Sequence, residues 1–328
     1  MNHELYRNIS GAALRRRNAL LSAAGLHTDE KTDVSVLVYD GERAIATGSR
    51  SGAVLKLFAT DDGYRGEDLT STVVTALVND ARENGYGHLF LYTKPEYENI
   101  FSGLFFYPVA RSRDVLLMEN RPGGISSFLS SLPKPESDGI NGALVMNANP
   151  FTLGHLHLAE RAASECDRVY LFVLSEDKSE FSTADRVKMV TLGVSHLKNV
   201  TVLETGPYMV SSATFPTYFL KNRESAEEVH CGLDIEIFAG LVAKRLSVTR
   251  RYVGTEPLSP TTNKYNEAMA RLLPKRDIQL IEVPRAENSD GPISAGRYRA
   301  LIKEGKREAA FSLLPKTSRD YILENKLI

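Results

Sequence analysis

The chain has 328 residues, a length typical of two domains that can each bury a core. It carries 40 Lys and Arg against 41 Asp and Glu, and this balance excludes a general electrostatic affinity for nucleic acid or an anionic membrane. Its two cysteines, Cys166 and Cys231, stand in no metal-ligand spacing, and the sequence shows neither a secretory leader nor an apolar run of membrane length. We therefore expect a cytoplasmic protein with no metal site and no disulfide framework.

Residues 1–120 predict a mixed α+β domain. A helix is expected over 11–26, with Arg15 to Arg17 on its solvated face. Alternating apolar residues around an Asp40-Gly41 turn predict a hairpin over 34–47. Apolar residues at helical spacing predict an amphipathic helix over 68–82. The other expected elements are strands at 54–58, 88–92 and 115–118 and a helix at 96–102.

Residues 121–139 have the proline, glycine and serine content of a linker, with one short helical turn expected at 125–129. From 140 to 328 apolar strands alternate with helices, which predicts an α/β, Rossmann-like domain with a parallel sheet covered on both faces. Such sheets bind ligands at the carboxyl ends of their strands, near the point where strand order reverses. The expected strands are 143–146, 169–173, 200–203, 251–253 and 279–283, with helices at 154–165, 184–196, 233–246 and 263–273.

The most informative segment runs from Met146 to His157, where the chain leaves the first of these strands and enters a helix at Gly154. Backbone N–H groups and the positive end of the helix dipole stabilise an anion at such a point. Gly154 lets a phosphate approach the backbone closely, and His155 can donate a hydrogen bond as charge develops on the phosphate. His157 is expected to be structural.

Thr152-Leu153-Gly154-His155 resembles the Thr/His-x-Gly-His hallmark of the nucleotidylyltransferase superfamily, in its Thr-first version. The second signature of that superfamily is typically Ile-Ser-Ser-Thr-x-x-Arg, and residues 293–299 match it at Ile293, Ser294 and Arg299. Ser294 is expected to cap the following helix, and Arg299 offers a fork of donors to a β- or γ-phosphate. Alone, either motif is equally well read as an ordinary helix start; together they predict a nucleotide site.

A more particular resemblance is to the citrate lyase ligases, carried by segments 145–155, 182–186, 213–219 and 253–257. Ala148-Asn149 stands where most of the superfamily has Phe-Asp, a departure that suits the ligases. The resemblance implies an enzyme that uses ATP with Mg²⁺, and no tightly bound cofactor, to convert acetate to acetyl-adenylate. The acetyl group would pass to the thiol prosthetic group of the acyl-carrier subunit of citrate lyase, its partner, with AMP and pyrophosphate released.

The first 120 residues resemble an acetyltransferase of the GNAT type, whose phosphate-cradling loop corresponds to Gly63 to Asp68. Arg65 and Gly66 could contact a CoA-like arm. Asp68 places negative charge where a pyrophosphate would lie, and it is also a good helix cap. We therefore expect this domain to dock the carrier or its arm rather than to turn over acetyl-CoA.

These resemblances imply a set of site residues. His155, Thr152, Ser294 and Arg299 are expected to be catalytic, with Lys178 and Arg186 as supporting cations that could equally be a solvated lysine and a surface ion pair. The expected ATP-binding residues are Asn147, Ala148, Asn149, Pro150, Phe151, Gly154, Lys178, Arg186, Gly254, Glu256 and Ile293.

Two other functions remain open. One is a plain nucleotidylyltransferase acting on phosphopantetheine or nicotinate mononucleotide, which leaves the first domain unexplained. The other is a carrier-binding or regulatory module without turnover, against which the intact set of catalytic residues argues.

Overall fold

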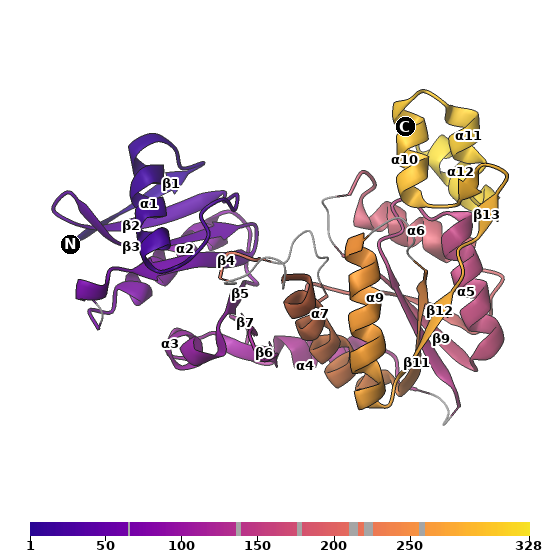
Figure 1. The fold of residues 1–328 in the computed structure, drawn as a ribbon, viewed down its shortest axis with the longest axis horizontal. Coiled ribbons are helices and arrows are strands. Elements are labelled where there is room, and N and C mark those ends of the chain that lie inside the picture. Colours follow the sequence, from indigo (N-terminus) through magenta and orange to yellow (C-terminus); the bar gives the residue numbers. More distant parts are fainter. Residues whose placement is uncertain (65, 136–138, 176–178, 210–215, 220–225, 256–259) are drawn as a thin grey trace. The chain divides into compact units, whose positions relative to one another are not determined.

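The computed structural model describes residues 1–64, 66–135, 139–175, 179–209, 216–219, 226–255 and 260–328 (Figure 1). The chain forms two compact units that are not continuous in sequence. Unit 1 comprises Met1–Ser127 and Thr214–Leu233, and unit 2 comprises Phe128–Ala213 and Asp234–Ile328. A short segment from the second half of the sequence therefore belongs to the first unit.

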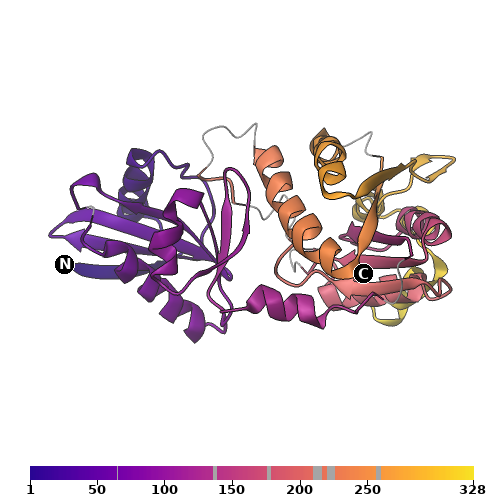
Figure 2. The same ribbon diagram turned by 90° about the horizontal axis from the view of Figure 1, so that it is seen from below.

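Unit 1 is built on a seven-stranded sheet in the order β1-β2-β3-β4-β5-β7-β6, in which only β4 and β5 are parallel neighbours. Figure 2 shows strands of this sheet as indigo and purple arrows. Its strands are β1 (Asn2–Arg7), β2 (Val34–Asp40), β3 (Arg43–Ser51), β4 (Val54–Thr60), β5 (Phe90–Thr93), β6 (Tyr107–Arg111) and β7 (Leu116–Glu119). Its helices are α1 (Gly11–Ala23), α2 (Leu69–Glu83) and α3 (Glu98–Ser102). The expected α+β architecture is confirmed, including the hairpin and the amphipathic helix.

Alternation along β2 separates the two faces of this sheet. Val34, Val36 and Val38 join the apolar core that α2 completes, whereas Ser35 between them turns to the opposite face and lies 3.4 Å from the guanidinium of Arg17 on α1. The expectation that Arg17 is solvated was therefore wrong. The residue is 3% exposed. Its hydrogen bonds to neighbouring polar groups offset the free-energy cost of removing the guanidinium from water.

Three further features of unit 1 differ from expectation. Strands β1 and β6 were not predicted, because β1 is a mostly exposed edge strand and β6 carries a proline, so neither shows a clean apolar alternation. Asp68 occupies the cap position of α2 but makes no capping hydrogen bond, since its backbone is left-handed with φ at 53°. It leaves the helix start without the side-chain acceptor that its residue type suggested.

Unit 2 holds a five-stranded parallel sheet in the order β10-β9-β8-β11-β12. Its strands are β8 (Asn141–Met146), β9 (Arg168–Val173), β10 (Val200–Glu204), β11 (Val248–Gly254) and β12 (Gln279–Val283). All five were expected. After β8 the chain adds β9 and β10 on one side of it, and then returns to add β11 and β12 on the other side. The strand order therefore reverses between β8 and β11. The parallel sheet confirms the predicted fold class and puts the switch point beside the end of β8.

Helices cover both faces of this sheet, as Figure 1 shows for α5 and α9. Right-handed crossovers require this, because the connections run in opposite directions on either side of β8. The helices that lie wholly in unit 2 are α5 (Leu153–Glu165), α6 (Thr183–Gly193), α8 (Lys244–Leu246), α9 (Pro260–Leu272), α10 (Ala295–Lys303), α11 (Arg307–Phe311) and α12 (Lys316–Glu324). Helix α7 (Ala226–Ile237) begins in unit 1 and ends in unit 2. A π-helical stretch, Phe238–Ala243, joins α7 to α8, and a small hairpin, β13 (Glu287–Asn288) with β14 (Gly291–Pro292), precedes α10.

The segment expected to be a linker contains α4 (Gly124–Ser131), longer than the single turn predicted there. No helix in the described parts of the chain combines the length and the apolar character needed to cross a membrane.

Candidate functional site

The site lies where β8 gives way to α5. Between them Ala148 adopts a left-handed backbone with φ at 51°, a conformation that non-glycine residues seldom hold. Asn147 is exposed at this turn, whereas Ala148 and Phe151 are 1% and 0% exposed. The buried side chains of the loop fix its course, so only its backbone and the Asn147 side chain are placed to meet a ligand.

The side chain of His155 has one defined tautomer. The backbone N–H of Thr152 donates to His155 Nδ1 over 3.0 Å, and a backbone N–H can only be a donor. Nδ1 is therefore the acceptor nitrogen, and in the neutral ring the proton is on Nε2. The Thr152 hydroxyl lies 3.0 Å from the same Nδ1 and donates to it. Thr152, which the sequence placed among the catalytic residues, is thus hydrogen-bonded to the histidine.

His155 is also held in its neutral form. Burial, as the larger cause, and the positive charge of Arg285 together lower the pKa of its imidazole to about 4. The ring stacks at 16° on that of Phe151, with centroids 5.8 Å apart. A neutral imidazole with its proton on Nε2 is a hydrogen-bond donor of fixed direction, as an anion site requires.

The two sequence motifs meet at Gly154. A Cβ atom added there would lie 2.7 Å from the carbonyl oxygen of Ile293, closer than real Cβ atoms approach a backbone oxygen. The start of α5 and the residue before the Ser294 cap are thus packed backbone against backbone. Glycine is required at 154 for this contact, in addition to any access it gives a phosphate.

The amide groups at the start of α5 are not all available. The N–H of Leu153 donates to the carbonyl oxygen of Leu313 over 2.9 Å. The N–H of Gly154 has no acceptor within the described residues, so it is the donor that this helix end offers to an anion.

The second motif caps α10 as predicted. Ser294 Oγ accepts from the backbone N–H of Arg297 over 3.1 Å. Arg299 reaches back to the first motif, where its Nη1 donates to the carbonyl oxygen of Asn149 over 2.6 Å. Asn149 in turn accepts the backbone N–H of Phe181 at its side-chain oxygen. Arg299 therefore ties α10 to the β8–α5 turn through one nitrogen of its guanidinium.

Arg186 lies beneath the turn and is 0% exposed, which excludes the surface ion pair suggested by its sequence position. Its guanidinium donates to the carbonyl oxygens of Asn147, Leu174 and Phe181. It also donates to the Asn147 side-chain oxygen over 2.8 Å. Arg186 thus orients Asn147 from behind.

Arg186→Met should lower the free energy of unfolding by about 3–5 kcal/mol, because it strips buried carbonyl oxygens of a charged donor. Urea denaturation followed by circular dichroism measures the loss. Lys188→Met changes an exposed residue on the same helix and should stay within about 0.5 kcal/mol of wild type. Equal losses in the two variants would contradict the role given to Arg186.

Gly254, at the end of β11, has open space where a Cβ would stand, and its carbonyl accepts from Asn266 over 3.1 Å. Gly66, in unit 1, has φ at 95° and likewise open space at its Cβ position. Three of the expected residues, Lys178, Glu256 and Arg65, fall outside the described residues.

Arg285 was not among the residues expected in the site. It lies two residues after the end of β12, and its Nε donates to the carbonyl oxygen of Thr255 over 2.8 Å. This bond holds its charge near His155, while burial lowers the pKa of its guanidinium. Its position at the carboxyl end of a parallel strand was the available signal. Within the described residues, no cluster of His, Cys, Asp and Glu could hold a metal ion.

His155 should remain neutral down to about pH 4, which ring-carbon NMR titration measures directly. Because the unfolded histidine titrates near 6.5, the unfolded chain binds more protons below that pH. Stability from neutral His155 is then complete above about pH 6.5 and is lost as the pH falls toward about 4, with an upper limit of about 3 kcal/mol. His155→Gln cannot titrate and should lack this part of the pH dependence. A midpoint near 6.5 in the folded protein would refute it.

Comparison with known proteins identifies relatives of both halves. Residues 141–322 match the family model of the citrate lyase ligase C-terminal domain. A citrate (pro-3S)-lyase ligase of Klebsiella pneumoniae is 37% identical over 305 residues, which are 91% of this chain and 89% of that protein. One of Escherichia coli K12 is 36% identical over 304 residues, 90% of this chain and 86% of that protein.

Two other similarities are partial. A phosphopantetheine adenylyltransferase of Symbiobacterium thermophilum is 36% identical over 67 residues, which are 20% of this chain and 41% of that protein. The crystal structure of Escherichia coli ElaA aligns with 37% of this chain and 99% of its own, at 13% identity and a TM-score of 0.33.

Proposed function

The chain belongs to the citrate lyase ligase family, and from this premise we propose that it activates acetate with ATP and acetylates citrate lyase. The relatives that align with nearly the whole chain are ligases that act on citrate lyase, and they support the overall reaction. The adenylate route is supported by the site. Its strongest support is the contact of Gly154 with Ile293, which joins the two phosphate-binding motifs into one site beside a neutral His155.

The proposed reaction has two steps. An acetate oxygen attacks the α-phosphorus of ATP, the bond from that phosphorus to the β-phosphate oxygen breaks, and pyrophosphate leaves. The thiol of the prosthetic group on the acyl-carrier subunit then attacks the acetyl carbon, AMP leaves with the bonding electrons, and the thiol proton is released. Mg²⁺ brought by ATP would supply positive charge to the pyrophosphate as it departs.

The first step needs alignment and charge stabilisation more than proton transfer. His155 donates from Nε2 and Gly154 from its backbone to the α-phosphoryl oxygens as negative charge builds up on them. Thr152 fixes the histidine tautomer through its N–H and hydroxyl. It is therefore a positioning residue in this proposal.

Pyrophosphate is held from the second helix. The start of α10 presents its dipole, with Ser294 as the cap and Ile293 setting its distance from α5. Arg299 and Arg285 supply the cations, and Lys178 adds a third. Asn147, oriented by Arg186, and the backbone from Ala148 to Phe151 contact the nucleotide. Gly254, at the end of β11, and Glu256 are proposed as further contacts.

The test is exchange of labelled pyrophosphate into ATP with acetate as the sole added acid. Exchange that depends on acetate supports adenylate formation. If exchange needs the carrier, adding citrate lyase in its thiol form should start it and yield acetylated carrier and AMP. Absence of pyrophosphate exchange with acetate alone, and of both exchange and acetylated carrier with citrate lyase added, would refute the proposal.

A plain adenylyltransferase is the second candidate, favoured by the partial match to a phosphopantetheine adenylyltransferase. It would use the same ATP site with a phosphorylated acceptor. Substituting phosphopantetheine or nicotinate mononucleotide for acetate in the exchange assay separates the two. Exchange with either acceptor and none with acetate would favour this candidate.

A further inference from the structure

The sheet of unit 1 opens at its parallel pair. Strands β4 and β5 are paired only at Val54 with Phe90 and at Leu55 with Leu91. Two residues further on, Leu57 has a left-handed backbone with φ at 59°, which bends β4 and ends the ladder. Beyond that point the N–H of Leu57 on β4 and the carbonyl of Tyr92 on β5 need other partners.

Tyr218 supplies both partners, although it lies more than a hundred residues away in the sequence. Its hydroxyl donates to the Tyr92 carbonyl oxygen over 3.1 Å and accepts from the N–H of Leu57. The ring is 4% exposed, and burial raises the pKa of the phenol. Phe219 packs edge-on against it, with ring centroids 5.0 Å apart. A single phenol thus bridges the two strands where their own hydrogen bonds stop.

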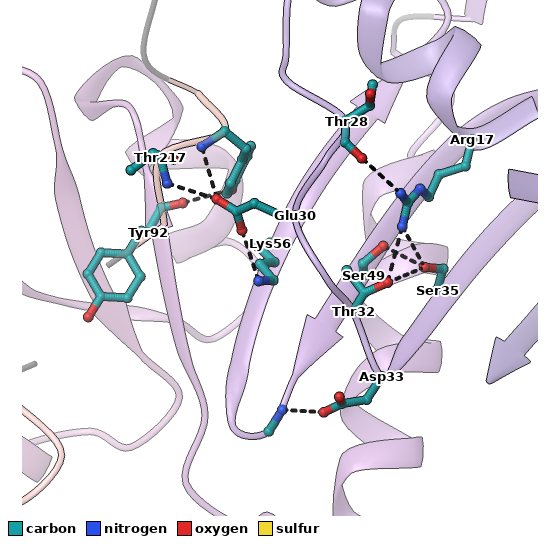
Figure 3. Close-up of polar contacts among 12 residues, drawn as sticks. Arg17, Thr28, Glu30, Thr32, Asp33, Ser35, Ser49, Lys56, Tyr92 and Thr217 are labelled. Carbon is teal, nitrogen blue, oxygen red and sulfur yellow. Dashed lines mark hydrogen bonds and ion pairs between the residues drawn. The ribbon is translucent and has the colours of Figure 1, made fainter. Parts of the chain in front are cut away.

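The backbone next to Tyr218 is hydrogen-bonded as well, and Figure 3 shows Glu30 bonded to both Thr217 and Lys56. Glu30 Oε1 accepts from the N–H of Thr217 over 2.8 Å and from the N–H of Tyr218 over 3.1 Å. The other oxygen of Glu30 pairs with Lys56 on β4 over 2.8 Å. The N–H of His27 donates to the carbonyl oxygen of Tyr218 over 2.9 Å. The N–H, the carbonyl and the hydroxyl of Tyr218 are therefore all bonded to residues 27–92.

We propose that the opening between β4 and β5 is a docking site for segment 216–219 of the same chain, which closes unit 1 to acyl-CoA. The occupant is matched in side chain, backbone and charge, as a peptide ligand is matched to its receptor. An external ligand with an extended chain of amides would need the same Leu57 N–H and Tyr92 carbonyl. It would first have to displace a buried ring and the hydrogen bonds that hold it.

This assigns a role to a unit that resembles an acetyltransferase. The docked segment lies between β10 and α7 in the sequence, within the long connection that crosses from one arm of the unit 2 sheet to the other. Unit 1 anchors that connection instead of transferring an acyl group. The inference goes beyond the proposed ligase chemistry and does not depend on it.

Hydrogen–deuterium exchange of the full chain, read in a fragment spanning 216–219, tests the docking. The amides of Thr217 and Tyr218 should be protected in wild type. Glu30→Gln, which weakens their acceptor, should speed their exchange about ten- to hundredfold. Glu98→Gln, which breaks an ion pair with Arg111 in the same unit, should not. Unprotected amides in wild type, or equal rates in all three proteins, would overturn the proposal.

A second pair of variants tests the docking independently, in case Glu30→Gln does not fold. Tyr218→Phe removes only the bridging hydroxyl and should also speed exchange in the segment, whereas Tyr64→Phe loses an exposed bond to Asp40 and should not. Adding acetyl-CoA to wild type should leave the segment's exchange unchanged. Acceleration by acetyl-CoA would show that Tyr218 yields to an external ligand and would refute closure. Neither readout uses ATP, so the outcome is independent of the ligase assay.

Discussion

Replacing His155 with alanine should lower acetate-dependent ATP–pyrophosphate exchange by about 10²–10³-fold. The reason is geometric. The Thr152 N–H and hydroxyl both donate to Nδ1 of His155, so in the neutral ring the proton is on Nε2 and only Nε2 can donate a hydrogen bond. A preorganised donor aimed at developing charge on a phosphate contributes about this much to catalysis, because it needs no reorganisation during the reaction.

The matching control is His157→Ala, two residues further along α5 and exposed. It should keep near-wild-type exchange, since it shares the helix but not the hydrogen bonds of His155. Circular dichroism of both variants should be unchanged. If loss of His157 were as damaging as loss of His155, the assignment of the donor would be wrong.

Conserving the donor should restore part of the rate. His155→Asn keeps an N–H donor on a shorter side chain, and we expect it to exchange faster than His155→Ala but well below wild type. The ranking separates hydrogen-bond donation from proton transfer, which asparagine cannot perform.

The sequence predicted the parts of this site that depend on local chemistry. The hydrogen bonds that start α5 join residues within Thr152 to His155, so they depend little on the rest of the chain. Ser294 likewise caps α10 through a bond to Arg297, three residues further on. The strand–helix rhythm of 140–328 likewise determined the parallel sheet, because only helices on both faces can cover such apolar strands.

The remainder depends on contacts between segments far apart in the sequence. Nothing local distinguishes Arg186, buried under the turn, from Arg16, which is solvated on α1. Arg285 acquires its role from the neighbouring strand end, and Arg17 is buried because the polar residues around it accept its protons. The docking of Tyr218 joins residues 27–92 to a segment that the sequence pattern had placed wholly in the other domain.

Gly154→Ala should be nearly as damaging to exchange as loss of the histidine, with an expected fall of about 10²-fold. The added Cβ would lie 2.7 Å from the carbonyl oxygen of Ile293, and neither partner is a flexible side chain that can move away. The starts of α5 and α10 must therefore separate. A shift of about 1 Å between groups that hold the same nucleotide costs a factor of this size.

Gly296→Ala is the matched control, because it adds the same methyl group to α10 itself. Its Cβ would meet only Ser294 Oγ, at 3.8 Å. Alanine inside a helix is favoured over glycine by up to about 1 kcal/mol, so this variant should melt at the same or a higher temperature and keep its exchange rate. Gly154→Ala should melt lower, by the equivalent of about 1–3 kcal/mol. If both variants retained full exchange, the contact between the motifs would be packing alone, and the two helix starts would not need to act on one nucleotide.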